Sequence, residues 1–219
     1  MKIGFLQIIF LFWFTASVGQ TFKIVQFPIK WNDERKHLTL DYLEKRHGIN
    51  TDSFSIVPKM VVVHWTSIDN FFDTYMAFYE PILSGRPEIV NASPLNVSSQ
   101  YLIDRDGTIY QLLPDTVFAR HTIGLNYCAI GIENVGGLKQ PLTKQQLLAN
   151  AFLIRELCDK YPIEFVLGHH EYELFRNTSW WKETDPNYLT EKIDPGEKFM
   201  RKLRRKLKEI NLRNLKDIV

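Results

Sequence analysis

The sequence is poor in cysteine, with Cys128 and Cys158 as the two present among 219 residues. So small a number excludes a fold held together by a network of disulfides. Both lie in segments that we expect to pack together, one at the start of a strand and one at the end of a helix. A single disulfide is therefore conceivable in an oxidising compartment, and buried free thiols are the alternative that the sequence leaves open.

Long apolar runs are also lacking beyond the first residues. After residue 19, no stretch approaches the roughly 18 uninterrupted apolar residues that a membrane-spanning helix needs. Residues 1–19 combine Lys2, the apolar run Ile8–Phe14 and a small-residue end, as a secretory signal peptide does. We expect cleavage near Gln20, a periplasmic or secreted protein, and no stable membrane span in the mature chain.

Charge is close to balanced over the chain, at +2, but it is unevenly distributed. Residues 197–219 hold nine Lys or Arg and three Asp or Glu. The apolar residues there recur at spacings of three and four, which indicates one face of a helix: Phe199, Leu203, Leu207 and Ile210. Such a helix packs its apolar face on the domain, and contact of its cations with an anionic surface is the second interpretation. Nucleic acid is not an expected partner of an exported protein.

Predicted helices and strands alternate along the chain, without repeats or low-complexity linkers. Strands are predicted at 60–63, 129–133 and 164–167, a hairpin at 101–112 around Asp106-Gly107, and helices at 32–48, 68–79 and 143–158. This order predicts one α/β domain with a mixed central β-sheet flanked by helices. A monomer is expected.

Candidate metal ligands occur in three separate segments. His64 and His169 each follow an apolar strand, and Asp194 belongs to a Lys-Ile-Asp-Pro-Gly segment. In open α/β sheets, ligands bind beyond the carboxyl ends of the strands, where these histidines fall. Two imidazoles and one carboxylate leave a position on a zinc ion for water, as in catalytic zinc sites. The sequence therefore predicts a Zn²⁺ hydrolase site.

Two of these ligands have rivals nearby in the sequence. His170 competes with His169, and alternation along a strand would let one of the pair face the metal. Asp185 competes with Asp194. We prefer Asp194 because Gly196 permits a tight backbone turn after it.

Two further residues fit the chemistry of amide hydrolysis. Glu133 ends the predicted strand 129–133, where its carboxylate could take a proton from water and return it to the leaving amine. Lys192 precedes Asp194 by two residues, so that in an extended segment its ammonium would project on the same side. There it could stabilise the oxyanion that develops on the attacked carbonyl. Solvated surface charges are the alternative interpretation of both.

The ordered set of motifs resembles a known family over residues 58–200. The motifs are His64-Trp-Thr, then Ala119-Arg-His-Thr-Ile-Gly-Leu-Asn-Tyr-Cys-Ala-Ile-Gly-Ile-Glu-Asn134, then Gly168-His169 and Lys192-Ile-Asp-Pro-Gly196. They resemble those of the type 2 N-acetylmuramoyl-L-alanine amidases, relatives of the peptidoglycan recognition proteins. The resemblance implies a single zinc amidase domain that cuts the bond between N-acetylmuramic acid and L-alanine in peptidoglycan or muropeptides.

The resemblance also implies roles for individual residues. His64, His169 and Asp194 match the zinc ligands, Glu133 the general base and Lys192 the transition-state cation. His121, Asn126 and Trp65 match residues that line the substrate groove. Two other functions stay open from the sequence: a non-catalytic peptidoglycan-binding module, and a zinc peptidase that acts on the stem peptide.

The resemblance leaves parts of the chain unexplained. We expect an N-terminal extension at 20–57 packed on the amidase domain at 58–200, and a basic C-terminal helix at 201–219. An insertion at 171–191 contains Trp180, Trp181 and Tyr188. These aromatic side chains could stack on sugar rings or anchor the loop in the core.

Overall fold

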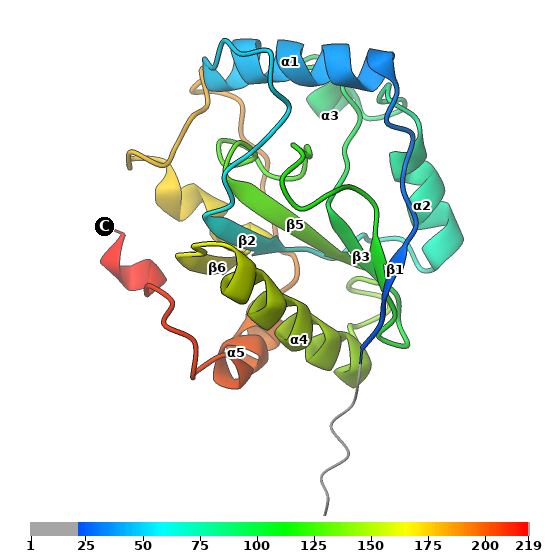
Figure 1. The fold of residues 1–219 in the computed structure, drawn as a ribbon, viewed down its shortest axis with the longest axis vertical. Coiled ribbons are helices and arrows are strands. Elements are labelled where there is room, and N and C mark those ends of the chain that lie inside the picture. Colours follow the sequence, from blue (N-terminus) through cyan, green and yellow to red (C-terminus); the bar gives the residue numbers. More distant parts are fainter. Residues whose placement is uncertain (1–21, 219) are drawn as a thin grey trace, which may run out of the picture.

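The computed structural model describes residues 22–218, and the expected signal peptide at 1–19 lies outside the described residues. Six strands form one mixed sheet in the order β1-β4-β3-β5-β2-β6 (Figure 1). The strands are β1 (Ile24–Gln26), β2 (Met60–Val63), β3 (Tyr101–Ile103), β4 (Ile109–Gln111), β5 (Ala129–Asn134) and β6 (Phe165–Gly168). The helices are α1 (Asp33–His47), α2 (Phe71–Tyr79), α3 (Pro87–Val90), α4 (Lys144–Lys160) and α5 (Glu197–Lys206), with short 3-10 helices η1 (His169–Phe175) and η2 (Leu215–Asp217). The predicted fold class, a mixed sheet flanked by helices, is confirmed.

The centre of the sheet is parallel, and every residue of β2 and β6 is buried. β2 lies between β5 and β6, with Val63 opposite Ile132 on one side and Gly168 on the other. The predicted hairpin is present as the antiparallel pair β3 and β4. Because β2, β5 and β6 run in the same direction, their carboxyl ends meet at one edge of the sheet.

Local sequence signals explain several of the helix boundaries. Asn32 caps α1 by accepting a hydrogen bond from the Arg35 amide, and Gly48 ends the helix in the left-handed conformation at φ 64°. Thr143 and Gln146 form the predicted capping box of α4. α2 begins at Phe71, three residues after its predicted start, because Ile68 pairs with Gly136 in an isolated β-bridge.

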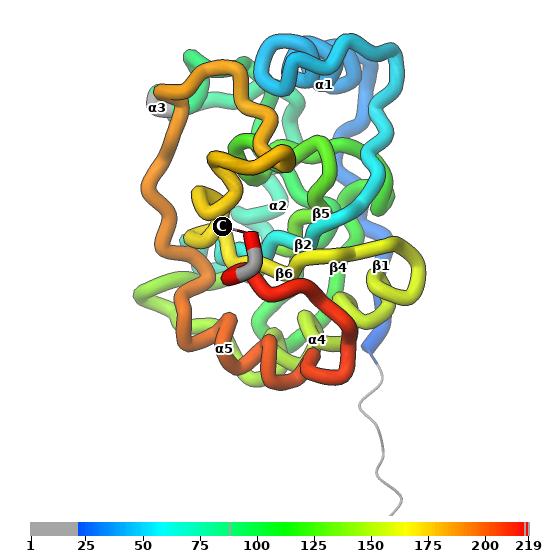
Figure 2. Tube along the Cα trace, turned by 90° about the vertical axis from the view of Figure 1, so that its left-hand side faces the viewer, coloured from blue at the N-terminus to red at the C-terminus, as the bar shows by residue number. Residues whose placement is uncertain are grey.

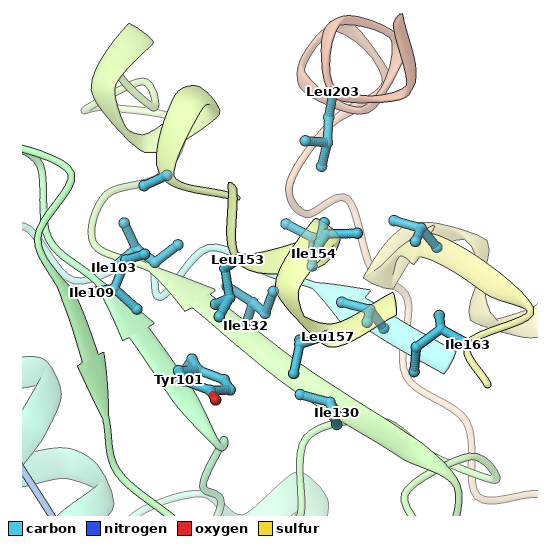
Figure 3. Packing of buried hydrophobic residues seen from close by; sticks show 14 of the residues in the cluster. Tyr101, Ile103, Ile109, Ile130, Ile132, Leu153, Ile154, Leu157, Ile163 and Leu203 are labelled. Carbon is cyan, nitrogen blue, oxygen red and sulfur yellow. The ribbon is translucent and has the colours of Figure 1, made fainter. Parts of the chain in front are cut away.

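The two faces of the sheet are covered by different layers. Val61 and Val63 of β2 point toward α4 and α5, while Met60 and Val62 point to the opposite side. Figure 3 shows α4 residues Leu153, Ile154 and Leu157 over Ile130 and Ile132 of β5, with Leu203 of α5 beside them. Since all these residues are buried, α4 and α5 form the principal helical layer of the core.

The C-terminal helix is shorter than the sequence predicts. α5 covers 197–206, and Met200, Leu203 and Leu207 bury its apolar side. The chain then turns back toward the start of β6, where the Arg213 amide donates to the Glu164 carbonyl at 2.9 Å. This return path is incompatible with a helix that continues through residue 218.

The N-terminal extension is part of the same layered structure. β1 pairs in parallel with β4, and α1 lies at the top of Figure 1. The 171–191 segment contacts the end of α1: the Thr184 amide donates to the Arg46 carbonyl at 3.0 Å, and Arg46 Nη2 lies 2.8 Å from Glu183 Oε1. Figure 2 shows the chain after η1 rising to α1.

The aromatic residues of the 171–191 segment pack inward. The Trp181 ring stacks on Tyr172 with centroids 5.9 Å apart, and Trp180 meets Phe165 of β6 edge-on at 5.9 Å. Tyr188 is buried. These contacts favour the interpretation of the aromatic residues as anchors of the segment.

The two cysteines do not form a disulfide. Cys128 and Cys158 are free thiols, and burial raises the pKa of Cys128 to about 12. Within residues 22–218, no helix has the length and apolar character needed to cross a bilayer.

Candidate metal centre

His64 is fixed at the carboxyl end of β2 by the neighbouring strand. Its amide donates to the Ile132 carbonyl at 2.8 Å, and its carbonyl accepts from Asn134 Nδ2 at 2.9 Å. Asn150 of α4 in turn donates to Asn134 Oδ1 at 2.7 Å. The backbone that carries the first candidate ligand is therefore held on two sides before any metal binds.

Three buried side chains converge beyond this strand end. Asp194 Oδ2 lies 3.3 Å from His64 Nδ1 and 3.2 Å from His169 Nδ1. One ligand atom from each residue lies within 4.8 Å of the others. Among the residues that the structure describes, this is the one group of three or more His, Cys, Asp or Glu side chains with such spacing.

The donor set and its spacing fit zinc. Ligand atoms bound tetrahedrally at about 2.0–2.1 Å from zinc lie about 3.3 Å from one another, which matches both distances to Asp194. Two imidazole nitrogens and one carboxylate oxygen are ligands that zinc accepts, and three protein ligands leave a coordination position for water. His64, His169 and Asp194 could therefore hold a catalytic zinc ion.

The protonation states of the cluster also suit a cation. Burial lowers the pKa of His169 to about 4, so its imidazole is neutral near pH 7. Burial alone would raise the pKa of Asp194, but the neighbouring His169 and His64 side chains hold it well below its ordinary value. Neutral imidazole beside an ionised carboxylate is the state that metal binding requires.

His121 contacts His64 from behind. Its Nε2 lies 3.2 Å from the Ala129 carbonyl oxygen, which can only accept, so Nε2 carries the hydrogen. Burial lowers the pKa of His121 well below its ordinary value, so Nδ1 keeps a lone pair and accepts from His64 Nε2 at 3.1 Å. This assignment leaves the lone pair of His64 on Nδ1, the atom that faces Asp194.

Gly131 makes room for the His121 ring. A Cβ atom on this residue in the middle of β5 would lie 2.8 Å from the ring carbons of His121, which is too close for a real contact. The absence of a side chain at Gly131 therefore lets His121 lie against the strand and reach His64.

The rival ligands lie elsewhere. His170 Nδ1 is 2.9 Å from the Asp194 backbone carbonyl and takes no part in the cluster. His169 and His170 begin η1 instead of continuing β6. The alternation of side chains along a strand therefore does not apply to them, but their rings do contact different groups, the Asp194 carboxylate and the Asp194 backbone carbonyl. Asp185 lies 3.8 Å from Arg46 at the end of α1. Gly196 has φ 86°, which agrees with the tight turn expected after Asp194.

Glu133 lies beside the cluster at the end of β5. Its Oε2 is buried and has no hydrogen-bond partner within the described residues. Burial raises the pKa of Glu133 to about 7, with the Asp194 charge adding to the rise and the charges of His64 and Lys192 opposing it. A carboxyl group with a pKa near neutrality can exchange a proton in both directions.

All the predicted site residues line one cleft of about 630 Å³: His64, Trp65, His121, Asn126, Glu133, His169, Lys192 and Asp194. Met76, Ile82 and Arg86 contribute from α2 and the following loop, and Tyr188 and Thr190 from the 171–191 segment. The structure thus brings together the eight residues that the sequence assigns to the site. Their individual roles stay predictions.

Asn126 shows how a groove residue can also serve the fold. Its Oδ1 accepts from the amides of His121 and Thr122 at 2.9 and 2.8 Å. These bonds shape the loop that presents His121. They favour a structural role for Asn126, which the sequence leaves as open as direct substrate contact.

Sequence reasoning missed the residues that support the cluster. Gly131 and Asn134 occur in the motif that ends at Asn134, but neither they nor Asn150 have ligand chemistry that would predict a supporting role. A glycine inside a strand was the available signal, since such a residue often marks a close approach by another group.

Comparison with known proteins identifies the family and the fold of the chain. The family model described as N-acetylmuramoyl-L-alanine amidase matches residues 42–197. The solved structure of the N-acetylmuramoyl-L-alanine amidase LysC from Clostridium intestinale URNW is similar with a TM-score of 0.54 and 22% identity, covering 88% of this chain and 100% of that one. A selenomethionine derivative of AmpD is similar with a TM-score of 0.53 and 22% identity, covering 84% and 93%.

These structural similarities show a shared fold. No curated protein sequence matches the chain. The family match extends from within α1 to the first residue of α5 and includes the whole candidate metal centre. Because it covers most of the sequence, the chain belongs to the N-acetylmuramoyl-L-alanine amidase family.

Proposed function

We propose that the protein is a zinc-dependent amidase that hydrolyses the bond between N-acetylmuramic acid and L-alanine in peptidoglycan or its fragments. The convergence of His64, His169 and Asp194 in a cleft that Glu133 and Lys192 also line carries this proposal. Membership of the amidase family supports the choice of bond.

Zinc bound by the three ligands would polarise the substrate carbonyl and lower the pKa of water toward about 7. Glu133 takes the proton from the attacking water as its oxygen adds to the carbonyl carbon. Lys192 places its ammonium charge near the oxyanion that forms. Glu133 then gives the proton to the nitrogen of L-alanine as the carbon–nitrogen bond breaks, which leaves a lactyl carboxylate and a free amino terminus.

Two supporting contacts prepare the site for this reaction. His121 fixes the orientation of the His64 ring, and Asn134 fixes its backbone. The low exposure of the cluster strengthens electrostatic interactions within it.

A non-catalytic binding module is the alternative from another functional class. The complete set of ligands disfavours it, since a module that only binds needs neither three convergent ligands nor a buried carboxylate without a partner. A zinc peptidase would use the same groups on a bond within the stem peptide, so the position of the cut must be measured.

The test is to incubate purified sacculi and soluble muropeptides with the protein, before and after removal of metal by a chelator. Mass spectrometry should find stem peptides with a free L-alanine amino terminus, and chelation should abolish them until zinc returns. Cleavage between stem-peptide residues would establish the peptidase instead. Tight binding of muropeptide without any product in the presence of zinc would establish the binding module.

The site of action follows from the substrate. We propose that the protein works in the periplasm or outside the cell, because peptidoglycan lies there and the first residues have the order of a signal peptide. We also propose that it works as a monomer.

A further inference from the structure

The outer side of α5 is a cationic surface made of residues that take no part in the metal cluster. Exposed Lys or Arg side chains follow one another along it at helical spacings: Lys198, Arg201, Lys202, Arg205 and, just beyond the helix end, Lys208. We call these five residues the α5 stripe. Ten helical residues extend about 15 Å, so the stripe concentrates its charge over a short length.

The fold makes little use of these cations. Met200 and Leu203 are buried on the other side of α5 and attach the helix to the core. Within the described residues, α5 forms an ion pair through Arg204, which contacts Glu171 and does not belong to the stripe. The charges of the α5 stripe are therefore not what stabilises the helix on the domain. Instead they repel one another, a cost that an external anion would relieve.

A groove next to the stripe combines charge with apolar surface. Phe22, Leu148 and Phe152 line it together with the basic residues Arg155, Arg205, Lys206 and Lys208 and one acidic residue, Glu209. Glu209 forms an ion pair with Arg155 at 2.5 Å, so the lining keeps a net positive charge. The Phe22 ring meets Phe152 of α4 with centroids 5.4 Å apart. An amphiphile with an anionic head fits this combination better than a purely hydrophilic polyanion does, because the polyanion would leave the apolar wall uncovered.

The position of Phe22 adds a second argument. The described chain begins at this groove, and α4, α5 and the start of the chain lie together at the bottom of Figure 1. The cationic residues and the apolar wall therefore lie at one end of the described structure, where one flat surface could contact both.

We propose that the α5 stripe and the adjoining groove form a docking surface for the anionic phospholipid surface of a membrane. The surface holds the exported protein reversibly at the bilayer after signal cleavage, while the cleft stays available to substrate. The proposal concerns where the protein resides and does not depend on its hydrolytic activity.

The experiment measures binding of the exported protein to vesicles of phosphatidylcholine with and without 30% phosphatidylglycerol, by cosedimentation. The test variant is R201Q/K202Q/R205Q. Its matched control, K30Q/K36Q/K45Q, removes the same charge from surface ion pairs at and before α1, at the opposite end of the molecule in Figure 1. All three proteins share one amino terminus, so the comparison isolates the α5 stripe.

Each cation near an anionic bilayer strengthens binding about fivefold, so the test variant should bind phosphatidylglycerol vesicles on the order of a hundredfold more weakly than the parent. The control should bind within about threefold of the parent, and 0.5 M salt should release all three proteins. Thermal melting verifies that both variants are folded.

Several results would overturn the proposal. Equal losses in the two variants would mean that net charge alone matters, and undiminished binding of the test variant would exclude the stripe. Equal binding to neutral vesicles would exclude an electrostatic surface. Binding to soluble polyphosphate without binding to vesicles would identify a polymer as the partner instead.

Discussion

Nδ1 of His121 lies 3.1 Å from Nε2 of His64, and this contact determines which nitrogen of His64 can bind a metal. The Ala129 carbonyl fixes the hydrogen of His121 on Nε2. His64 must then donate from its own Nε2, which leaves Nδ1 unprotonated on the side of Asp194. A residue that is not itself a proposed ligand thus sets the protonation state of one ligand, His64.

Replacing His121 by Ala should weaken zinc binding by about 10- to 100-fold, the usual effect of losing a group that orients a metal-binding imidazole. Competition with a chromogenic chelator measures this directly. His121→Gln is the matched variant, because its side-chain carbonyl can still accept a hydrogen bond. Equal zinc affinities in the parent and the Ala variant would refute the orienting role.

Replacing Gly131 by Ala should weaken zinc binding through the same route, because the new methyl group would collide with the His121 ring. In a His121→Ala background the ring is absent, and the second substitution should then cost little. The double-mutant cycle in zinc affinity should therefore be strongly non-additive. Additive effects of the two substitutions would show that Gly131 acts independently of His121.

The ligands could be predicted from sequence because each ends or follows a recognisable element. β2 and β6 are short apolar runs, and ligands were expected beyond the carboxyl ends of such strands. The structure pairs the two strands in parallel, which places His64 and His169 at the same edge of the sheet. Asp194 was less certain, since Asp185 offers the same chemistry. The turn at Gly196 favours Asp194, and the structure places it against both histidines.

The supporting contacts could not be predicted in this way. The hydrogen bond from Asn150 to Asn134 joins α4 to β5 across the core, and its existence depends on how the helix is placed on the sheet. β1 was missed because three residues at a sheet edge give almost no periodic signal. The length of α5 was overestimated because its apolar pattern continues into a segment that instead turns back to Glu164.

Replacing Glu133 by Gln should leave zinc bound and reduce kcat by about 10²- to 10⁴-fold, the typical contribution of a general base. The amide keeps the size of the side chain but cannot take a proton from water. Metal analysis and turnover of muropeptide are measured on the same preparation. Full activity in a zinc-loaded variant would remove Glu133 from its proposed role.

Glu133 should also make the stability of the metal-free protein depend on pH. Its folded-state pKa of about 7 lies above the ordinary value of 4.5, so between these values the folded protein holds a proton that the unfolded chain has lost. Stability therefore falls as pH rises through this window. Relative to the parent, the chelated Glu133→Gln protein should gain roughly 3 kcal/mol in free energy of unfolding between pH 4.5 and pH 8. Urea unfolding checks this, with the exposed Glu34→Gln as control; an equal shift in both would attribute the effect to net charge.

The Arg46–Glu183 ion pair should be more damaging to break than to replace. Its two side chains are 12% and 0% exposed, and Arg46 also lies 4.4 Å above the ring of Tyr188 in the cleft wall. Arg46→Met should destabilise the fold by about 3–5 kcal/mol, because it leaves the Glu183 carboxylate buried without its cation. The double variant Arg46→Met/Glu183→Leu should recover much of that loss. Both variants lack the cation above the Tyr188 ring, so both should have a higher KM for muropeptide than the parent if Arg46 positions Tyr188. Restoring the charge balance should therefore recover stability but not KM. A double variant as unstable as the single one would place the stabilising effect in the stacking on Tyr188 instead of the charge pair.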